Sequence, residues 1–139
     1  MTARHSRYAF LIYAHADKEA VHDLHARLSR AGVKAWLDVK DLIPGQNWET
    51  EIRRAILKSE AVIVCLSRRF GERRGYRYKE LRIALERAKL FPDELFIIPV
   101  RLEECRTPVS LRGLQRVDLF DAGGYKALIR SLRRGGVVR

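Results

Sequence analysis

Two short runs without a charged residue constrain the fold of this chain more than any other feature. They cover residues 8–13 (YAFLIY) and 61–66 (AVIVCL). Each run has the length of a strand and is too short to cross a membrane. A strand that lacks polar and apolar alternation is buried on both faces, as in parallel sheets covered by helices. The sequence therefore predicts an α/β domain.

Segments with helical periodicity alternate with strand-like segments along the rest of the chain. The first expected helix covers residues 18–30, with Asp17 as its N-cap and Gly32 as its stop. Asn47 is expected to cap a second helix, and a third contains Glu80 in its first turns. Further strands are expected at 33–37, 95–100 and 116–119, and a last helix follows the final strand. Pro99 indicates that the fourth strand lies near a sheet edge or that Pro99 is at a strand end.

Five strands that alternate with helices predict one doubly wound parallel sheet with the strand order 2-1-3-4-5. In that order the direction of winding reverses between strands one and three. Ligands bind such folds in the crevice at the carboxyl ends of these two strands. The expected crevice is flanked by residues 14–17 on one side and 67–80 on the other. Glu80 is therefore placed at the predicted binding site.

The composition indicates a single domain over residues 1–139, with a core from about 8 to 134 and a frayed tail at 135–139. A chain of this length with 47% hydrophobic residues can bury a sizeable core without disulfides. Its two cysteines are isolated, and Cys65 lies inside an apolar strand, where a thiol behaves as a small hydrophobe. Isolated thiols suit a reducing cytoplasm, so a cytoplasmic location is expected. No signal-peptide pattern is evident at the start of the sequence, and no membrane segment is predicted.

The charge is strongly positive, because 28 Lys and Arg stand against 17 Asp and Glu, a net charge of +11. Nine basic and three acidic residues lie between Arg68 and Lys89. This run is compatible with a solvated surface, with phosphate binding or with nucleic-acid binding. Nucleic acid is the weakest of the three, because acidic residues interrupt the run and no recognition motif accompanies it.

Motifs for common cofactors are absent from the sequence. It contains neither a G-x-G-x-x-G fingerprint nor a P-loop lysine, so a nucleotide would have to be held without a glycine cradle. His22 and His25 are spaced on one helix without a third ligand nearby, so no metal site is predicted.

Several stretches, in this order and spacing, resemble the Toll/interleukin-1 receptor (TIR) domain in its bacterial-type form. FLIYAHADKE resembles the first-strand motif of that family, and WLDVKDLIPGQNW resembles its long loop after strand two, the BB loop. GYRYKEL resembles its aromatic-x-x-K-E segment at the start of the helix after strand three. PVRLEEC and VDLFDAGGYKALIRSL resemble its closing strands and helix. The matched stretches lie at residues 10–19, 36–48, 75–81, 99–105 and 117–132.

The resemblance implies a flavodoxin-like fold and one of two functions. Some TIR domains hydrolyse or cyclise NAD and release nicotinamide, whereas others only assemble with further TIR domains to relay a signal. In the enzymatic members the glutamate of the aromatic-x-x-K-E segment is catalytic, and Glu80 occupies that position here. NAD is then a substrate and no cofactor is expected. The alternative for Glu80 is an exposed carboxylate that the dipole favours at a helix start.

The same resemblance implies further contacts with NAD. Tyr76 could stack on a ring of the substrate, and Asp38 could border the pocket. Ala14 and His15 follow strand one, where relatives meet the phosphates. Ala14 departs from the Ser or Arg common in the family, which weakens the expectation for this loop. Self-association is expected to use the BB loop, at Asp41, Ile43, Pro44 and Gly45.

Overall fold

The computed structural model describes residues 8–37, 44–70, 76–91, 94 and 96–137. Five strands form one parallel sheet in the order β2-β1-β3-β4-β5, so the predicted topology is confirmed. The strands are β1 (Tyr8–Ile12), β2 (Lys34–Trp36), β3 (Ala61–Leu66), β4 (Ile97–Arg101) and β5 (Val117–Asp118).

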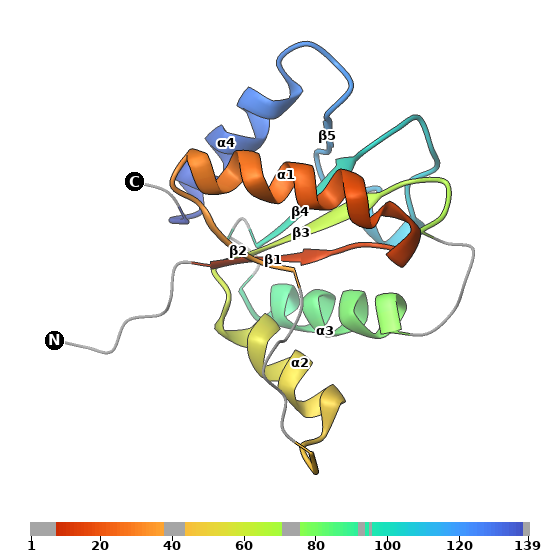
Figure 1. Ribbon diagram of the computed structural model, residues 1–139, viewed down its shortest axis with the longest axis vertical. Coiled ribbons are helices and arrows are strands. Elements are labelled where there is room, and N and C mark those ends of the chain that lie inside the picture. The colour runs from red at the N-terminus through yellow and green to blue at the C-terminus, as the bar shows by residue number, and fades with distance from the viewer. Residues whose placement is uncertain (1–7, 38–43, 71–75, 92–93, 95, 138–139) are drawn as a thin grey trace, which may run out of the picture.

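Helices cover both faces of the sheet, as Figure 1 shows. On one face lie α1 (Lys18–Arg30) and α4 (Gly124–Arg134), and on the other lie α2 (Trp48–Lys58) and α3 (Tyr76–Leu90). Two short 3₁₀ helices, η1 (His15–Asp17) and η2 (Val109–Leu111), lie in the connections. The bounds of α1 match the prediction from the sequence.

The core is divided by the sheet into two clusters, because successive side chains of a strand point to opposite faces. In β1, Phe10 and Ile12 pack with α2 and α3, whereas Ala9 and Leu11 pack with α1 and α4. All six residues of β3 are buried. Burial on both faces explains why the two apolar runs show no alternation.

Asn47 caps α2 as predicted, because its Oδ1 accepts a hydrogen bond of 2.9 Å from the backbone N–H of Thr50. We expect Asn47→Ala to lower the free energy of unfolding by about 1 kcal/mol, since that N–H would lose its acceptor. Chemical denaturation measures the effect. Asn47→Asp keeps a side-chain oxygen as acceptor, so its free energy of unfolding should stay within a few tenths of a kcal/mol of the wild-type value. An equal loss of stability in both variants would contradict the capping role.

One local expectation is wrong, and another is confirmed only in part. Asp17 precedes α1, but its side chain makes no capping hydrogen bond. Pro99 lies in the middle of β4, paired with Val64 of β3, and not at a strand end. The edge strand β5 pairs with β4 only at Val100 and Arg101, so Pro99 has no partner on that side, which agrees with the expectation of a place near a sheet edge.

The segment after α4 is packed rather than frayed as far as Val137. The backbone N–H of Val137 donates to the carbonyl of Leu132, and the Val137 side chain is buried in the core with α1 and α4. An apolar side chain near the chain end therefore holds the end of α4 against the sheet. The predicted frayed tail is wrong for this part of the segment.

None of the helices in the described part of the chain has both the length and the apolar character that a membrane span requires. Cys65 is fully buried, as expected for a thiol that behaves as a hydrophobe. Burial, together with the charge of Asp17, raises the pKa of the Cys65 thiol to about 12. The thiol is therefore protonated and unreactive near neutral pH.

Candidate functional site

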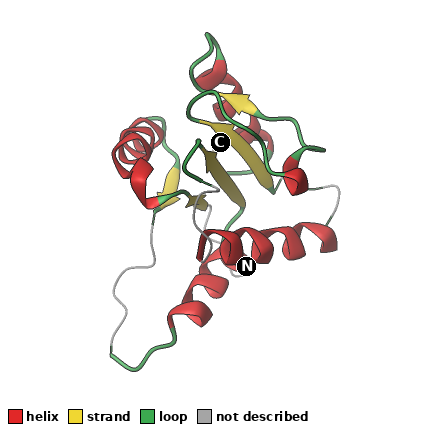
Figure 2. Cartoon of the chain, turned by 90° about the vertical axis from the view of Figure 1, so that its right-hand side faces the viewer, coloured by secondary structure: helices red, strands yellow, loops and turns green. Residues whose placement is uncertain are grey.

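The carboxyl edge of the sheet, where the sequence predicts a crevice, lies on the right of Figure 1 and faces the viewer in Figure 2. The neighbouring strands β1 and β3 both end at this edge. After β1 the chain enters α1 on one face of the sheet, whereas after β3 it enters α3 on the other face. In folds of this kind, ligands bind at the point of the edge where two such connections leave to opposite faces.

A hydrogen bond joins the two sides of this edge. The hydroxyl of Ser67, directly after β3, donates to Oδ2 of Asp17, in the connection after β1. The same Ser67 oxygen accepts a bond of 3.1 Å from the backbone N–H of Arg69. Ser67 is buried, so this link fixes the loops that flank the switch point. It also explains why the Asp17 carboxylate does not cap α1.

Glu80 lies in the second turn of α3 and is 5% exposed. In a helix it shares a face with Ile83 and Ala84, three and four residues later, and both are buried against the sheet. The adjacent Lys79 is exposed. The Glu80 carboxylate therefore points inward, at the end of α3 nearest the carboxyl edge. The alternative of an exposed helix-start glutamate does not fit this burial.

A buried carboxylate is uncommon, because removing its charge from water is costly unless polar partners surround it. Among the described residues only four polar or charged side chains are buried: Ser59, Ser67, Glu80 and Arg101. Ser59 bonds a backbone carbonyl of its own helix, and Ser67 bridges the two loops. Glu80 likewise interacts with another group of the protein. Such buried ionisable groups are found at functional sites more often than elsewhere.

The structure describes only some of the remaining predicted site residues. Ala14 is buried and its carbonyl accepts a hydrogen bond from the backbone N–H of Asp17, so it packs as part of the turn. His15 is exposed in η1. Tyr76 begins α3, and its side chain lies outside the described part of the structure. Asp38, Asp41 and Ile43 also lie outside the described residues.

Pro44 and Gly45 form an exposed turn before α2, at the bottom of Figure 1 and far from the sheet. Gly45 has a φ of +95°, a left-handed conformation that glycine adopts without strain. A Cβ at this position would meet no atom within 4 Å. The turn therefore presents its surface to solvent.

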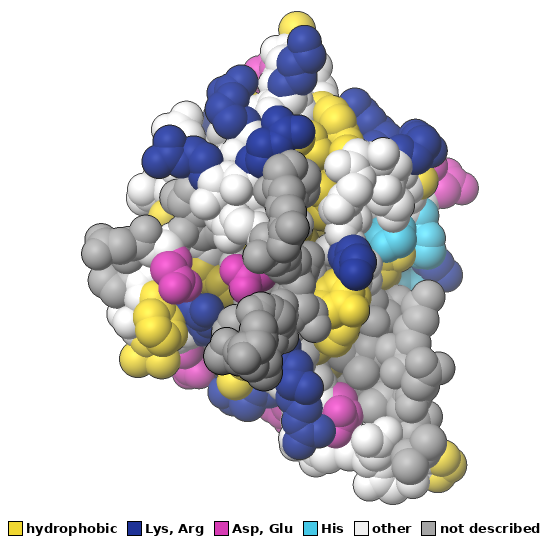
Figure 3. All heavy atoms as spheres, turned by 90° about the vertical axis from the view of Figure 1, so that its left-hand side faces the viewer, with side chains coloured by type: hydrophobic (Ala, Val, Ile, Leu, Met, Phe, Trp, Pro, Cys, Tyr) yellow, Lys and Arg dark blue, Asp and Glu magenta, His cyan; other side chains and the backbone are white. Residues whose placement is uncertain are grey.

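Basic side chains also gather outside the run at 68–89. In that run Arg68, Lys79 and Arg87 each pair with a carboxylate of another segment. In contrast, α4 contains no acidic residue, and its basic side chains gather on the upper part of the face in Figure 3. Its exposed basic residues are Lys126, Arg130, Arg133 and Arg134.

An ion pair that the sequence did not predict joins the last two strands, between a buried arginine and a partly buried aspartate. Arg101 Nε and Nη2 donate to the two carboxylate oxygens of Asp118 at 2.7 and 2.8 Å, and Nη1 donates to the carbonyl of Cys105 at 2.9 Å. Arg101 and Asp118 are register partners in β4 and β5. Because β5 has only two residues, this pair supplements a very short backbone ladder.

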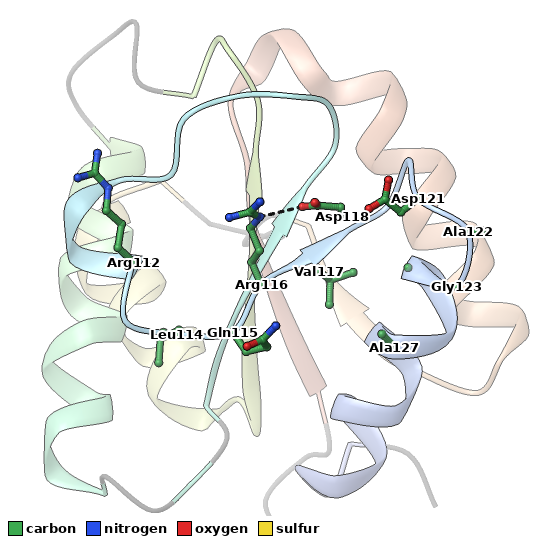
Figure 4. A pocket seen from close by; sticks show the side chains of 11 residues that line it. Arg112, Leu114, Gln115, Arg116, Val117, Asp118, Asp121, Ala122, Gly123 and Ala127 are labelled. Carbon is green, nitrogen blue, oxygen red and sulfur yellow. Dashed lines mark hydrogen bonds and ion pairs between the residues drawn. The ribbon is translucent and has the colours of Figure 1, made fainter.

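A polar hollow of about 540 Å³ opens beside this pair, between β5 and the start of α4 (Figure 4). Arg116 points at Asp118 there, and its Nε donates to Oδ1 at 3.0 Å. Asp118 is therefore shared by two arginines. Their hydrogen bonds hold its pKa at about 2, below its usual 3.8, against the opposing effect of burial. The charges of these three residues are satisfied within the protein.

The described residues hold no cluster of three His, Cys, Asp or Glu side chains that could bind a metal. His25 instead forms a hydrogen bond of 2.9 Å between its Nε2 and the carbonyl of Ala35. This contact ties α1 to β2 and gives the histidine a structural role.

The fold and the edge define a class of protein: a doubly wound, flavodoxin-like α/β domain with a carboxylate buried near its switch point. The family model for the TIR domain matches residues 10–133, and the chain belongs to this family. The family resemblance that the motifs carry is therefore confirmed.

Similar proteins come from bacteria, archaea and animals. An uncharacterized protein, y4cD, of Sinorhizobium fredii is 31% identical over 88% of this chain and 20% of its own length. The NAD(+) hydrolase TcpA of a Theionarchaea archaeon is 38% identical over 46% of this chain and 20% of its own length. The TIR domain of the Toll-related receptor TRR-2 of Hydra magnipapillata has a TM-score of 0.74 and 28% identity, covering 90% of this chain and 97% of that one. The chain thus spans about a fifth of each of these two curated relatives.

Proposed function

We propose that this domain is an NAD glycohydrolase that releases nicotinamide, with Glu80 as its catalytic residue. The burial of Glu80 on the inward face of α3, near the carboxyl edge, is the observation that carries the proposal. Partial similarity to an NAD(+) hydrolase supports the choice of substrate. The match of the Glu80 segment to the aromatic-x-x-K-E motif of enzymatic TIR domains supports the choice of residue.

The chemistry explains why a single carboxylate is sufficient. Breaking the bond between nicotinamide and ribose builds positive charge on the sugar, as in an oxocarbenium ion. A carboxylate fixed beside that sugar stabilises the charge and can accept hydrogen bonds from the ribose hydroxyls. Nicotinamide leaves as a neutral molecule, so no second acid has to protonate it. The site needs the charge of Glu80 and a position that water does not screen.

The activity is tested by incubating the purified domain with NAD and following nicotinamide by chromatography. We expect release that increases more than proportionally with protein concentration, because a BB loop of one copy would complete the crevice of another. Nicotinamide release in strict proportion to protein concentration would contradict the role of assembly, but it would not contradict NAD hydrolysis by the domain. No release above a blank, at high concentration or on a crowding surface, would reject the enzymatic proposal.

The second candidate function is self-association without catalysis. It is favoured by the turn at Pro44 and Gly45, which is exposed and lies away from the sheet. Exposed proline and glycine in a fixed turn offer a preorganised contact with little conformational entropy to lose. Under this hypothesis the domain assembles whether or not it turns over NAD.

We expect Gly45→Ala to weaken self-association roughly tenfold, equivalent to about 1.4 kcal/mol, because a Cβ disfavours the left-handed backbone of the turn. Sedimentation equilibrium measures the change. Gly113→Ala is the matched control, since Gly113 is also exposed with no atom near its Cβ position, but it does not have a left-handed φ. Equal association of both variants and the wild type would exclude the turn from the interface.

A further inference from the structure

A hollow of about 400 Å³ lies between the segment after β3 and the segment that joins β4 to β5. It opens on the β4 side of β3, whereas the predicted crevice lies on the β1 side. Its lining residues are Leu66, Ser67, Arg68, Phe70, Arg106, Thr107, Pro108, Val109 and Arg112. Nothing in the proposed NAD chemistry requires this hollow.

The lining contains three arginines and no acidic residue. Glu103, outside the lining, holds Arg68 in place: its Oε2 accepts a bond of 2.8 Å from the Arg68 backbone N–H, and its Oε1 lies 3.9 Å from Arg68 Nη1. Arg112 Nε donates to the carbonyl of Thr107 at 3.0 Å. Arg106 is exposed and forms no ion pair or hydrogen bond with the described residues. The lining therefore contains three arginines, of which Arg68 is paired with Glu103, whereas Arg106 and Arg112 have no carboxylate partner among the described residues. Such a set suits a dianion such as a phosphate.

The rest of the lining is apolar. Leu66 and Phe70 are buried at the inner side, and Pro108 and Val109 lie on the opposite segment. Val109 is 75% exposed, so a large apolar surface faces water beside the three arginines. A planar ring placed there would cover Val109 and gain the free energy of removing apolar surface from water. A phosphate alone would leave this surface uncovered.

We propose that this hollow binds a small phosphate monoester that carries a planar ring. The arginines hold the phosphate, and the ring lies against Val109 and Pro108. The volume falls in the range of small-molecule sites, which are mostly apolar with a few convergent polar groups. Glu80 is not among the lining residues of this hollow, and the proposal holds whether or not the domain hydrolyses NAD.

Phenyl phosphate is the simplest probe, because it has one ring and one phosphate dianion. We expect saturable changes in the amide NMR signals of Leu66, Phe70, Thr107 and Val109 when the probe is added to the purified chain. Inorganic phosphate should bind at least about tenfold more weakly, since it covers no apolar surface. Equal affinity for the two probes would overturn the role of the ring. Changes that do not saturate, or that centre on α4, would overturn the site.

Two variants of exposed residues test the site without disturbing the core. Arg106→Ala should weaken phenyl phosphate binding roughly tenfold, because it removes one charge-assisted hydrogen bond. Val109→Glu should abolish detectable binding, because it places a negative charge at the ring position. Unchanged affinity in both variants would reject the proposal.

Two matched controls distinguish binding in this hollow from binding elsewhere on the protein. Arg133→Ala removes an exposed arginine of α4 and should leave the affinity unchanged. Glu80→Gln should also leave it unchanged, because Glu80 lies outside the hollow. An equal loss with Arg133→Ala would show attraction to general positive charge. A change of affinity in either direction with Glu80→Gln would place the probe in the crevice, because removing a nearby carboxylate should strengthen the binding of a dianion. Either result overturns the proposal.

Discussion

Glu80→Gln is expected to reduce nicotinamide release from NAD by roughly 10²- to 10³-fold, the usual effect of removing one electrostatic contact to a transition state. Glutamine has nearly the same shape as glutamate and retains its carbonyl as a hydrogen-bond acceptor, so the packing of α3 should survive. What it lacks is the negative charge that opposes the developing sugar cation. The measurement is initial rate against NAD concentration. The loss should appear in kcat, because the interaction forms only in the transition state.

Glu86→Gln provides the matched control for this variant. Glu86 lies on the same helix, and its side chain is 59% exposed in an ion pair with Arg53. The same chemical change there should leave turnover unchanged, since exposed ion pairs contribute little. Circular dichroism should show that both variants are folded. A folded Glu80→Gln variant that keeps half of the wild-type rate of nicotinamide release would exclude Glu80 from catalysis. This result would favour the assembly function.

Arg101→Met should lower the free energy of unfolding by about 1–3 kcal/mol, the range for leaving a buried hydrogen-bonding group without its partner. Arg101 is 7% exposed, and the substitution leaves Asp118 with only the exposed Arg116 as its partner. The strand β5 would then rely on a two-residue ladder. Urea denaturation measures the effect. NAD turnover of the remaining folded protein should change little, because Arg101 lies on the far side of the sheet centre from β1.

The control for Arg101 is Arg116→Gln, which removes the other guanidinium from the same carboxylate. The Arg116 side chain is 46% exposed, so its loss should cost less than about 1 kcal/mol. The double variant Arg101→Met with Asp118→Leu should recover part of the stability, because both charges then leave the protein together. A loss from Arg101→Met no larger than that from Arg116→Gln would contradict the structural role of the pair.

The ion pair of Arg101 and Asp118 should make the free energy of unfolding depend on pH in the acid range. Hydrogen bonds from Arg101, then from Arg116, lower the pKa of Asp118 to about 2 in the folded protein, whereas its usual value is 3.8. A lowered folded pKa contributes stability above the unfolded pKa, and this contribution is lost as the pH falls through the folded pKa. The difference in stability between the wild type and Asp118→Asn should therefore narrow from about pH 5 to pH 2. A constant difference over this range would contradict the assignment.

The sheet order and the placement of Glu80 could be predicted because both depend on local signals. The run at 61–66 requires a strand buried on both faces, and the apolar spacing after it requires a helix with Glu80 in its first turns. The right-handed connection rule and the alternation of elements then leave few topologies. Bounds were predicted less well at short strands such as β5, where pairing with a neighbour decides the extent.

The contacts that complete the carboxyl edge could not be predicted in the same way. Asp17 had the position and residue type of an N-cap, but its carboxylate accepts a bond from Ser67, fifty residues later. Arg101 and Asp118 could be recognised only as polar residues at the ends of apolar strands; their register made them partners. The hollow beside Arg106 depends on how two irregular segments are positioned relative to each other in the folded chain.

Sequence by itself determined the layers of this protein, the order of its strands and the edge at which Glu80 lies. Apolar spacing and helix punctuation are properties of neighbouring residues, so they can be recognised without coordinates. Tertiary structure alone decided that Glu80 is buried, that Ser67 joins Asp17 and that Arg101 joins Asp118. The physical reason is that burial and pairing depend on side chains from distant segments, whose positions are fixed only when the helices pack on the sheet.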